Sequence, residues 1–297
     1  MSPLIRYFLC LVSLLTLIHC ATDTNPLQGI DDHDDLCRDS TKVYVKEGIF
    51  IELSALKSVY SLDDTISGDL YLINENNEEG LEIFISNWPP SGGYRVFNEH
   101  DQSVYFNVWV TGCAEFHHFL MPGDTLHEPI FWTQQTATSQ DYYSRLKLFS
   151  GHYRLQGFFW GSEALWGKYA LKCFHITEEG EPLSTKAHRH YEVDDSIKVS
   201  FLVRNRVSGN QQFTLNALKE IEIHYIRNGQ TILNQFDYLD LPDSTLNFDP
   251  HSDRTLYTYS IAKNDSLLSG LDGRYDLTFI LRCQERTIQA SVATYIF

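Results

Sequence analysis

Short segments in which apolar and polar residues alternate recur along the first half of the chain. They are rich in β-branched and aromatic side chains, and turn-forming stretches such as NENNEEG, PPSGG and MPGD separate them. A period of two places successive side chains on opposite faces of a strand, so the pattern predicts antiparallel β-strands joined by turns. The segments are KVYVKEGIFIEL, TISGDLYLINEN, GLEIFISNW, YRVFNEH, QSVYFNVWV, HYRLQGFFW and KYALKCFHI.

A second series of the same kind follows the charged stretch TEEGEPLSTKAHRHYEVDD and runs SIKVSFLVRN, EIEIHYIRNG, TLYTYSIA, RYDLTFILR and TIQASVATYIF. No long segment with helical periodicity interrupts either series. The sequence therefore predicts an all-β fold with two immunoglobulin-like antiparallel β-sandwich domains in tandem. We place the first domain at 41–178, a linker at 179–192 and the second domain at 193–297.

The two series share a short motif in which a glycine precedes a tyrosine by two positions. It occurs in SGHYRLQGFF, with Gly151 and Tyr153, and again in DGRYDLTFIL, with Gly273 and Tyr275. In immunoglobulin-like sandwiches a tyrosine near the start of the penultimate strand turns its ring inward and its hydroxyl onto nearby backbone. The glycines allow the chain to turn just before that strand. We expect equivalent structural corners in the two domains.

The first twenty residues have the layout of a secretory signal peptide, with Arg6, an apolar run and then Cys20. Cys20 is either a residue of the cleavage site or the lipid-carrying first residue of a lipoprotein. Residues 21–40 lack periodicity and are predicted to form a flexible leader. No later stretch is apolar enough to span a bilayer. We expect an exported protein that is extracellular, periplasmic or envelope-associated and meets the membrane only through a lipid at Cys20.

Four cysteines remain beyond the signal peptide, which is an even number in a chain predicted to be exported. None forms the close CxxC pair that zinc sites usually need, and the export route is oxidising, so disulfides are predicted. Three connectivities are open, and the sequence does not choose among them. The candidates are Cys37, Cys113, Cys173 and Cys283.

The chain is acidic, with 23 Lys and Arg against 39 Asp and Glu and a net charge of −16. No basic cluster interrupts this excess. Binding to nucleic acid draws most of its affinity from neutralised phosphates, so nucleic acid is excluded as the expected partner.

The stretch EFHHFLMPGDTLHEPIFW at 115–132 raises the question of a metal site, because it holds His117, His118, His127 and Glu128. Pro-Gly-Asp is turn chemistry, so one strand enters and another leaves. Neighbours on a strand point to opposite faces, so the two adjacent histidines diverge, as do His127 and Glu128. A catalytic zinc needs three ligands that converge on one ion. We therefore predict no metal and no cofactor here.

The sequence contains no nucleophile elbow, HExxH helix, phosphate loop or dinucleotide fingerprint, and so no enzyme is predicted. Aromatic residues beside Gly, Pro or Ser in SNWPPSGGY and FFWGSEALWGKY give a different signal. Loop aromatics on a β-sandwich stack on sugar rings or anchor a protein partner. The candidate binding residues are Trp88, Tyr94, Trp160, Trp166 and Tyr169.

Residues 65–160 also resemble a known family. The runs YLINENNEEGLEIFISN, YRVFNEHDQSVYF, FLMPGDTLHEPIFW and SGHYRLQGFF are similar to the proteinase-inhibitor domain of the BsuPI type. The scaffold residues that match are Asn74, Gly123, Gly151 and Tyr153, and no reactive loop is matched. The resemblance implies an immunoglobulin-like fold and proteinase inhibition. The second domain is similar only to immunoglobulin-like or fibronectin-like domains in general.

These observations favour an exported, non-catalytic binding or structural protein of the cell envelope or extracellular space. Proteinase inhibition is the first alternative, and the second is a carbohydrate-binding or carbohydrate-active accessory protein. The expected partner is a protein or a polysaccharide.

Overall fold

Twenty β-strands and one single-turn 3₁₀ helix make up the regular structure of the part of the chain that is described. The computed structural model describes residues 38–86, 92–107, 115–136, 145–191, 197–241, 243–261 and 273–296. Over these ranges the predicted all-β class is confirmed. No helix within them is long and apolar enough to cross a membrane.

Several predictions from the sequence lie outside the described residues, namely the signal peptide with Cys20, the leader up to residue 37 with Cys37, and also Trp88 and Cys113. The last residues of the predicted leader, 38–40, are described, and two of them bind residues of β11 (Ala170–Ile176). Ser40 and Leu171 exchange two backbone hydrogen bonds, of 3.0 and 2.8 Å. Asp39 binds the side chain of Lys172. The leader prediction is therefore wrong at its C-terminal end, where the backbone pairs with the first sandwich.

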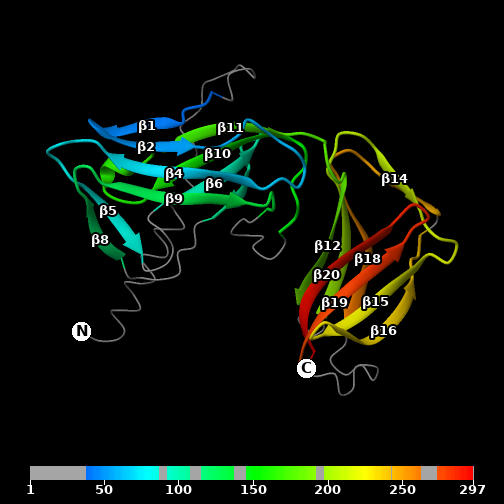
Figure 1. The fold of residues 1–297 in the computed structure, drawn as a ribbon. Coiled ribbons are helices and arrows are strands. Elements are labelled where there is room, and N and C mark those ends of the chain that lie inside the picture. The colour runs from blue at the N-terminus through cyan, green and yellow to red at the C-terminus, as the bar shows by residue number, and fades with distance from the viewer. Residues whose placement is uncertain are drawn as a thin grey trace. The chain divides into compact units, whose positions relative to one another are not determined.

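Two facing sheets and a small strand pair form the first half of the fold (Figure 1). One sheet has the order β1-β2-β4-β9, with β1 at Lys42–Lys46, β2 at Ile49–Ser54, β4 at Ile66–Asn74 and β9 at Thr125–Trp132. The other has the order β3-β11-β10-β6-β7, with β3 at Val59–Tyr60, β11 at Ala170–Ile176, β10 at Gly151–Phe159, β6 at Gly92–Asn98 and β7 at Ser103–Phe106. The small pair joins β5 (Leu81–Ser86) to β8 (Glu115–Leu120).

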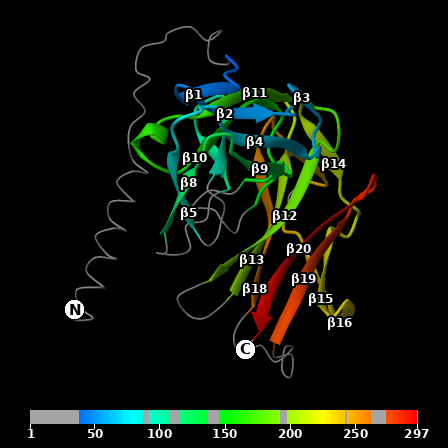
Figure 2. The same ribbon diagram turned by 60° about the vertical axis from the view of Figure 1, so that its left-hand side comes forward.

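The second half is built from three corresponding parts (Figure 2). One sheet has the order β12-β13-β18, with β12 at Leu183–Tyr191, β13 at Ile197–Asn205 and β18 at Asp253–Ile261. The other has the order β16-β15-β19-β20, with β15 at Glu220–Arg227, β16 at Gln230–Tyr238, β19 at Gly273–Arg282 and β20 at Thr287–Ile296. The small pair joins β14 (Gln211–Thr214) to β17 (Thr245–Phe248).

The same strand order therefore occurs twice along the chain. The set β2-β4-β9 corresponds to β12-β13-β18, and β11-β10-β6-β7 corresponds to β20-β19-β15-β16. The small pairs β5-β8 and β14-β17 lie at matching places in the chain order. The linker predicted at 179–192 is wrong over most of its length, because β12 pairs with β13 from Leu183 to Tyr191. Lys186 and Arg189 made this segment look like a charged connection, although Leu183 and Ala187 are buried.

Each half has its own hydrophobic core between its two main sheets. Strand β15 shows how the alternation predicted from the sequence produces it, because every second residue, from Ile221 through Ile223 to Tyr225, is buried. Leu155 and Leu277 are both fully buried, at matching positions on β10 and β19. Burying a side chain of this size stabilises a fold by about 1.5–3 kcal/mol.

A buried asparagine ends the matching strand of each half, Asn74 on β4 and Asn205 on β13. The Asn74 side-chain amide donates to the carbonyls of Glu79 and Leu120, at 2.9 and 3.0 Å. That of Asn205 donates to the carbonyls of Gly209 and Asp249, both at 2.8 Å. In both cases the side-chain oxygen accepts the backbone N–H two residues further on. In both halves, therefore, a buried asparagine holds the segments next to the end of the strand by hydrogen bonds to their backbone.

The predicted tyrosine corners differ between the halves. Gly151 and Gly273 have φ of +141° and +121°, so both occupy backbone that favours glycine. The buried Tyr153 donates its hydroxyl hydrogen to the carbonyl of Phe149 at 2.9 Å, as expected for such a corner. The hydroxyl of the buried Tyr275 accepts instead from the Arg227 guanidinium at 3.3 Å. The prediction of a backbone partner is therefore wrong for Tyr275.

The cysteines also depart from the prediction. Cys173 is disulfide-bonded, and its partner lies outside the described residues. Cys283 is a free thiol buried in the second core, so its assignment to a disulfide is wrong. Burial raises the pKa of this thiol to about 11. The even count of cysteines failed as an argument because packing, not number, decides which thiols can meet.

The side chain of Arg206 lies against residues of the first half although it follows β13 of the second. It is fully buried and donates to the carbonyl of Leu148 at 2.8 Å and to both carboxylate oxygens of Asp63 at 3.0 Å. Its backbone carbonyl accepts the N–H of Ser150 at 2.7 Å. Burial opposes the charge of Asp63, but Lys147 and Arg206 outweigh it and hold the pKa of that carboxyl below its usual value.

Replacing Tyr153 by Phe removes the corner hydrogen bond and leaves the Phe149 carbonyl without it. We expect the free energy of unfolding to fall by about 1 kcal/mol in urea titrations, since that is the usual net worth of such a bond. Tyr275→Phe is expected to cost less, because its bond is longer. Tyr44→Phe, at an exposed site on β1, serves as the control and should change stability by less than about 0.5 kcal/mol. Equal effects of Tyr153→Phe and the control would contradict the corner.

Arg206→Met is expected to lower the free energy of unfolding by about 3 kcal/mol, because the Asp63 carboxylate and the Leu148 carbonyl both lose the guanidinium that donates to them. Arg282→Met is the matched control, since Arg282 pairs with Glu222 from an exposed position and should matter much less. A lowered carboxyl pKa stabilises the fold above the unfolded value and the stabilisation is lost as pH falls. The difference between wild type and Arg206→Met should therefore shrink below about pH 4. A difference that does not change with pH excludes the role of Asp63.

Candidate functional site

One end of the first sandwich gathers the connections that carry most of the predicted binding residues. Strand β10 ends there at Phe159, which pairs with Gly92 at the start of β6. The residues from 160 to 169 then lead to β11, and we call them the aromatic loop. Strand β5 contacts this loop, because Ile83 forms a β-bridge with Gly161.

The Pro-Gly-Asp turn helps to fix this end. The Gly123 N–H donates to the carbonyl of Asn74 at 2.8 Å, and the Asn74 N–H donates to the carbonyl of Asp124 at 3.0 Å. Gly123 has φ of +85°, which a side chain would disfavour. The turn predicted between β8 and β9 is present, and it locks onto the buried asparagine at the end of β4.

The aromatic loop is held to the sandwich at its base. Ser162 donates its N–H to the carbonyl of Glu82 at 3.2 Å. The 3₁₀ helix at Glu163–Leu165 turns the Leu165 side chain into the first core, where it is almost fully buried. A Cβ on Gly161 would lie 2.5 Å from the Leu165 side chain and 2.9 Å from the Glu82 carbonyl. The loop therefore packs so closely that only glycine fits at that position.

Three of the predicted aromatic residues lie exposed on this loop. Trp166 is 69% exposed, Trp160 is 40% exposed and Tyr169 is 37% exposed. The Trp160 ring meets Phe158 edge to face, with 5.1 Å between ring centroids. A large indole left in water on an anchored loop has most of its apolar surface available for a ligand.

Tyr94 is not a binding residue, contrary to the prediction. It is buried in the first core, where its hydroxyl donates to the carbonyl of Phe131 at 2.9 Å and its ring stacks on Tyr105. Burial raises the pKa of this phenol well above its usual value. The prediction was wrong because the glycines before Tyr94 signal a loop, whereas Gly92 and Gly93 belong to β6, where Gly92 lies tightly against Phe159.

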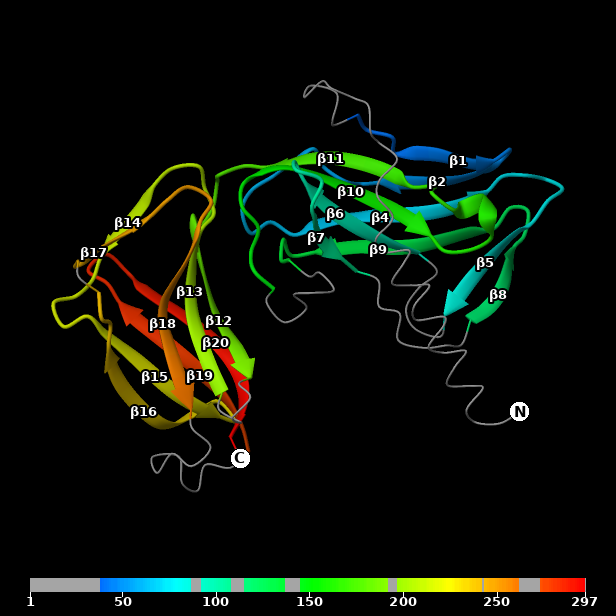
Figure 3. The same cartoon turned by 180° about the vertical axis from the view of Figure 1, so that it is seen from behind.

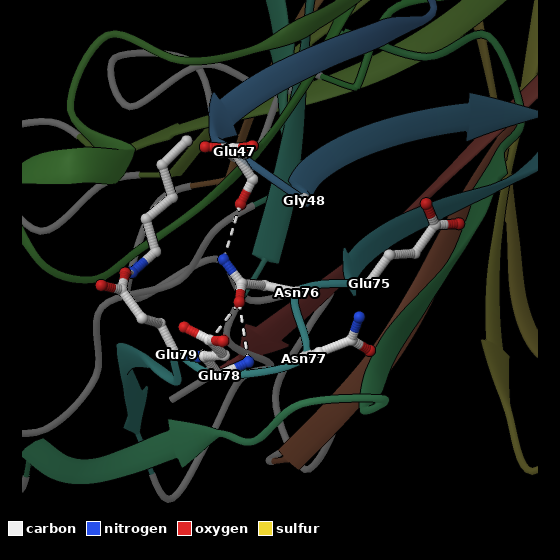
Figure 4. A pocket seen from close by; sticks show the side chains of 8 residues that line it. Glu47, Gly48, Glu75, Asn76, Asn77, Glu78 and Glu79 are labelled. Carbon is white, nitrogen blue, oxygen red and sulfur yellow. Dashed lines mark hydrogen bonds and ion pairs between the residues drawn. The ribbon is translucent and has the colours of Figure 1, made fainter.

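A hollow of about 570 Å³ lies beside the same end, between the β1–β2 turn and the residues after β4 (Figure 4). The Asn76 side chain donates to the carbonyl of Glu47 at 3.1 Å and accepts the N–H groups of Glu78 and Glu79. Lys46 pairs with Glu79 at 2.8 Å. Four of the eight lining residues are glutamates, but the described ranges contain no group of three His, Cys, Asp or Glu side chains that could hold a metal ion.

Of the histidines in the 115–132 stretch, the structure describes the side chains of His118 and His127, and neither belongs to a group of three metal-ligating side chains among the described residues. His127 stacks on Tyr71, and its Nε2 lies 2.6 Å from Oδ1 of Asp69. His118 is exposed on β8. His117 lies opposite Phe84 in the β5–β8 pair, and its side chain is outside the described residues.

Glu128 is the residue of this stretch whose importance the sequence reasoning missed. It lies opposite Leu70 in the β4–β9 ladder, and Leu70 is fully buried, so the carboxyl is on the core side of the sheet. Burial raises its pKa to about 7, against smaller opposing effects of His127 and of a hydrogen bond from the Gly92 N–H. Period two would have revealed this, because Glu128 shares its face with Leu126 and Ile130. An inward charge on an outer strand opposes edge-to-edge pairing.

Comparisons with known proteins give little beyond this geometry. No family model matches the chain, and no curated protein matches it. Among solved structures, it is similar to a mutant of Salmonella alpha-2-macroglobulin at a TM-score of 0.30 and 9% identity, over 87% of this chain and 16% of that one. It is also similar to E. coli alpha-2-macroglobulin in its native conformation, at a TM-score of 0.24 and 10% identity, over 91% and 15%. The chain thus spans about a sixth of their length, and scores this low do not establish a shared fold.

Glu128→Gln should change how stability depends on pH. An acid whose pKa is higher in the folded than in the unfolded state holds more protons when folded, so stability falls as pH rises from about 4.3 to above 7. The Gln variant lacks this dependence, so we expect it to be more stable than wild type at pH 8 in urea titrations. The advantage of the variant in free energy of unfolding should be smaller at pH 5 than at pH 8. Glu163→Gln removes the same charge from an exposed site and is the control. Parallel pH profiles for wild type and Glu128→Gln would contradict a raised pKa of this half-buried carboxyl.

Proposed function

We propose that this chain is an exported, non-catalytic binding protein made of two immunoglobulin-like domains in tandem. Its binding surface is the aromatic loop at the end of the first domain. The observation that carries the proposal is Trp166, which is 69% exposed on a loop that Leu165 and backbone hydrogen bonds anchor to the sandwich. A rigid, exposed aromatic residue offers apolar contact area without the entropic cost of ordering a mobile loop.

The repeated strand order supports the division into two domains. Each half has a three-stranded set facing a four-stranded set, plus a small pair at the same place in the chain order. The buried Asn74 and Asn205 make equivalent hydrogen bonds at the ends of equivalent strands. Two separate hydrophobic cores fit this division, since a core of its own is what defines a domain. With β12 included, we place the start of the second domain close to Leu183.

Two observations support export. The first twenty residues have the signal-peptide layout, and Cys20 is either a cleavage-site residue or the attachment point of a lipid. Cys173 is disulfide-bonded, and stable disulfides persist mainly in oxidising compartments. We therefore propose an extracellular, periplasmic or envelope-associated location.

The ligand is a protein or a polysaccharide. Tryptophan is enriched at the energetic centres of protein interfaces, and indole and phenol rings also stack on sugars. The resemblance of residues 65–160 to BsuPI-type domains favours proteinase inhibition as the particular protein-binding function. A carbohydrate-binding or carbohydrate-active accessory role is the other alternative.

Affinity electrophoresis in gels that contain soluble polysaccharides, together with inhibition assays on serine, cysteine and metalloproteinases, tests the two ligand classes. We expect one class to give binding, and Trp166→Ala to weaken it by about tenfold or more, as loss of a central aromatic contact does. Tyr44→Ala removes another largely exposed ring, from β1, and should leave binding unchanged. If both variants bind as wild type does, the aromatic loop is not the binding surface. If no polysaccharide and no proteinase binds, both ligand classes tested are excluded.

A further inference from the structure

Strand β16 is the outer strand of its sheet, and no other strand of the described residues pairs with its far edge (Figure 3). It runs for nine residues beside β15, from Gln230 to Tyr238, and most of its side chains are exposed. An edge strand of this length presents a row of backbone donors and acceptors to any chain that can lie against it.

The direction of these backbone groups follows from one hydrogen bond at the end of the strand. Leu239 donates its N–H to the carbonyl of Lys219 at 2.9 Å. In an antiparallel ladder such bonds alternate, so the N–H and C=O groups of Asp237 and Gln235 face β15, and those of Tyr238 and Phe236 face away from it. In agreement, the Tyr238 N–H donates to the side chain of Asp237 rather than to the ladder.

The strand is fixed from its inner face. The hydroxyl of Tyr257 on β18 binds the Asp237 carboxylate, and the hydroxyl of Tyr259 donates to the Gln235 side chain at 2.5 Å. Tyr259 is in turn joined to Tyr225 of β15 at 2.7 Å. A strand that is already held in place loses little further entropy when a partner pairs with its free edge.

The outer face of the strand carries a row of large apolar side chains. Phe236 is 56% exposed and Tyr238 is 61% exposed, and they lie two residues apart on a regularly paired stretch, so they share a face. Ile232, 48% exposed, precedes this stretch at a β-bulge opposite Tyr225. Added strands gain affinity from backbone hydrogen bonds and specificity from side chains on alternate positions. The exposed apolar side chains of β16 would provide this specificity.

Outer strands of the first half are protected by means that β16 lacks, whereas β16 has a β-bulge near its start and the inward carboxylate of Asp237, which Tyr257 binds. Strand β1 carries Lys42 and Lys46, β9 carries Pro129, and β7 has only four residues. Lysine, proline and shortness are the usual means of preventing unwanted pairing at an edge. The sequence of β16, QTILNQFDY, contains no Lys, Arg or Pro.

Charge identifies the kind of segment that fits. Asp237 lies in the strand, Asp240 and Asp243 follow it and are exposed, and Glu220 lies opposite Tyr238 on β15. The whole chain carries a net charge of −16. A basic segment therefore meets complementary charge here, whereas a second copy of this chain brings the same acidic edge and is repelled.

We propose that β16 binds an extended, basic segment of a partner protein, which adds to the sheet as a further strand. The segment carries Lys or Arg at alternate positions and apolar residues between them, which contact Phe236 and Tyr238. This surface lies on the second half of the fold and is independent of the aromatic loop.

A fluorescein-labelled peptide of alternating lysine and valine, long enough to span β16, is the probe, and fluorescence anisotropy measures its binding to the full chain. We expect saturable binding that falls by about tenfold or more in Phe236→Lys. Asn234→Pro should weaken it similarly, because proline removes an outward N–H and is tolerated on an outer strand. Tyr44→Lys, the same kind of change on β1, should bind as wild type does. Circular dichroism and thermal unfolding verify that each variant is folded.

A peptide of the same composition with prolines in place of alternate valines separates strand addition from charge attraction. Strand addition predicts binding weaker by about tenfold or more, whereas equal binding of the two peptides would mean attraction alone and would overturn the proposal. Unchanged binding in folded Phe236→Lys overturns it as well. Sedimentation velocity tests the other occupant, since a dimer that disappears in Phe236→Lys assigns the edge to a second copy of the chain.

Discussion

A buried side-chain amide at the end of one strand in each half holds the loops of this protein together. Asn74 and Asn205 are fully buried, and each donates to backbone carbonyls of segments that follow or cross its strand, the buried carbonyl of Leu120 among them. An unsatisfied buried carbonyl costs as much as a lost hydrogen bond, so the crossing segments can close over the core only while these amides are in place. The Pro-Gly-Asp turn and the start of β5 depend directly on Asn74.

Arg206, the next residue after Asn205, extends this arrangement from one half of the fold to the other. Its guanidinium meets the Leu148 carbonyl and the Asp63 carboxylate, and neighbouring Val207 packs into the first core. A buried guanidinium is tolerated only when its donors are paired. Arg206 can therefore be buried after β13 only if Asp63 and Leu148, which are distant in the sequence, lie beside it. The two cores are thereby joined by the polar contacts of Arg206 and by the packing of Val207.

This scaffold leaves two surfaces that its own packing does not use. The aromatic loop exposes Trp166 on a rigid base, and β16 exposes a backbone edge beside Phe236 and Tyr238. The aromatic loop is a connection and β16 is an outer strand, whereas every second side chain of the central strands is buried in a core. Glu128 lies on the core side of the outer strand β9, opposite the fully buried Leu70, so its carboxyl belongs to neither of these surfaces.

The sequence alone determined the all-β class, the glycines before the two tyrosines and the exposed aromatics after β10, because these follow from period-two alternation and local turn chemistry. It could not determine that Tyr94 and Cys283 are buried, that charged β12 is a strand, or that Arg206 reaches Asp63. Alternation says which residues share a face, but not which strand lies beside which. Burial and pairing arise from contacts between segments distant in the chain, and these exist only once the tertiary structure has formed.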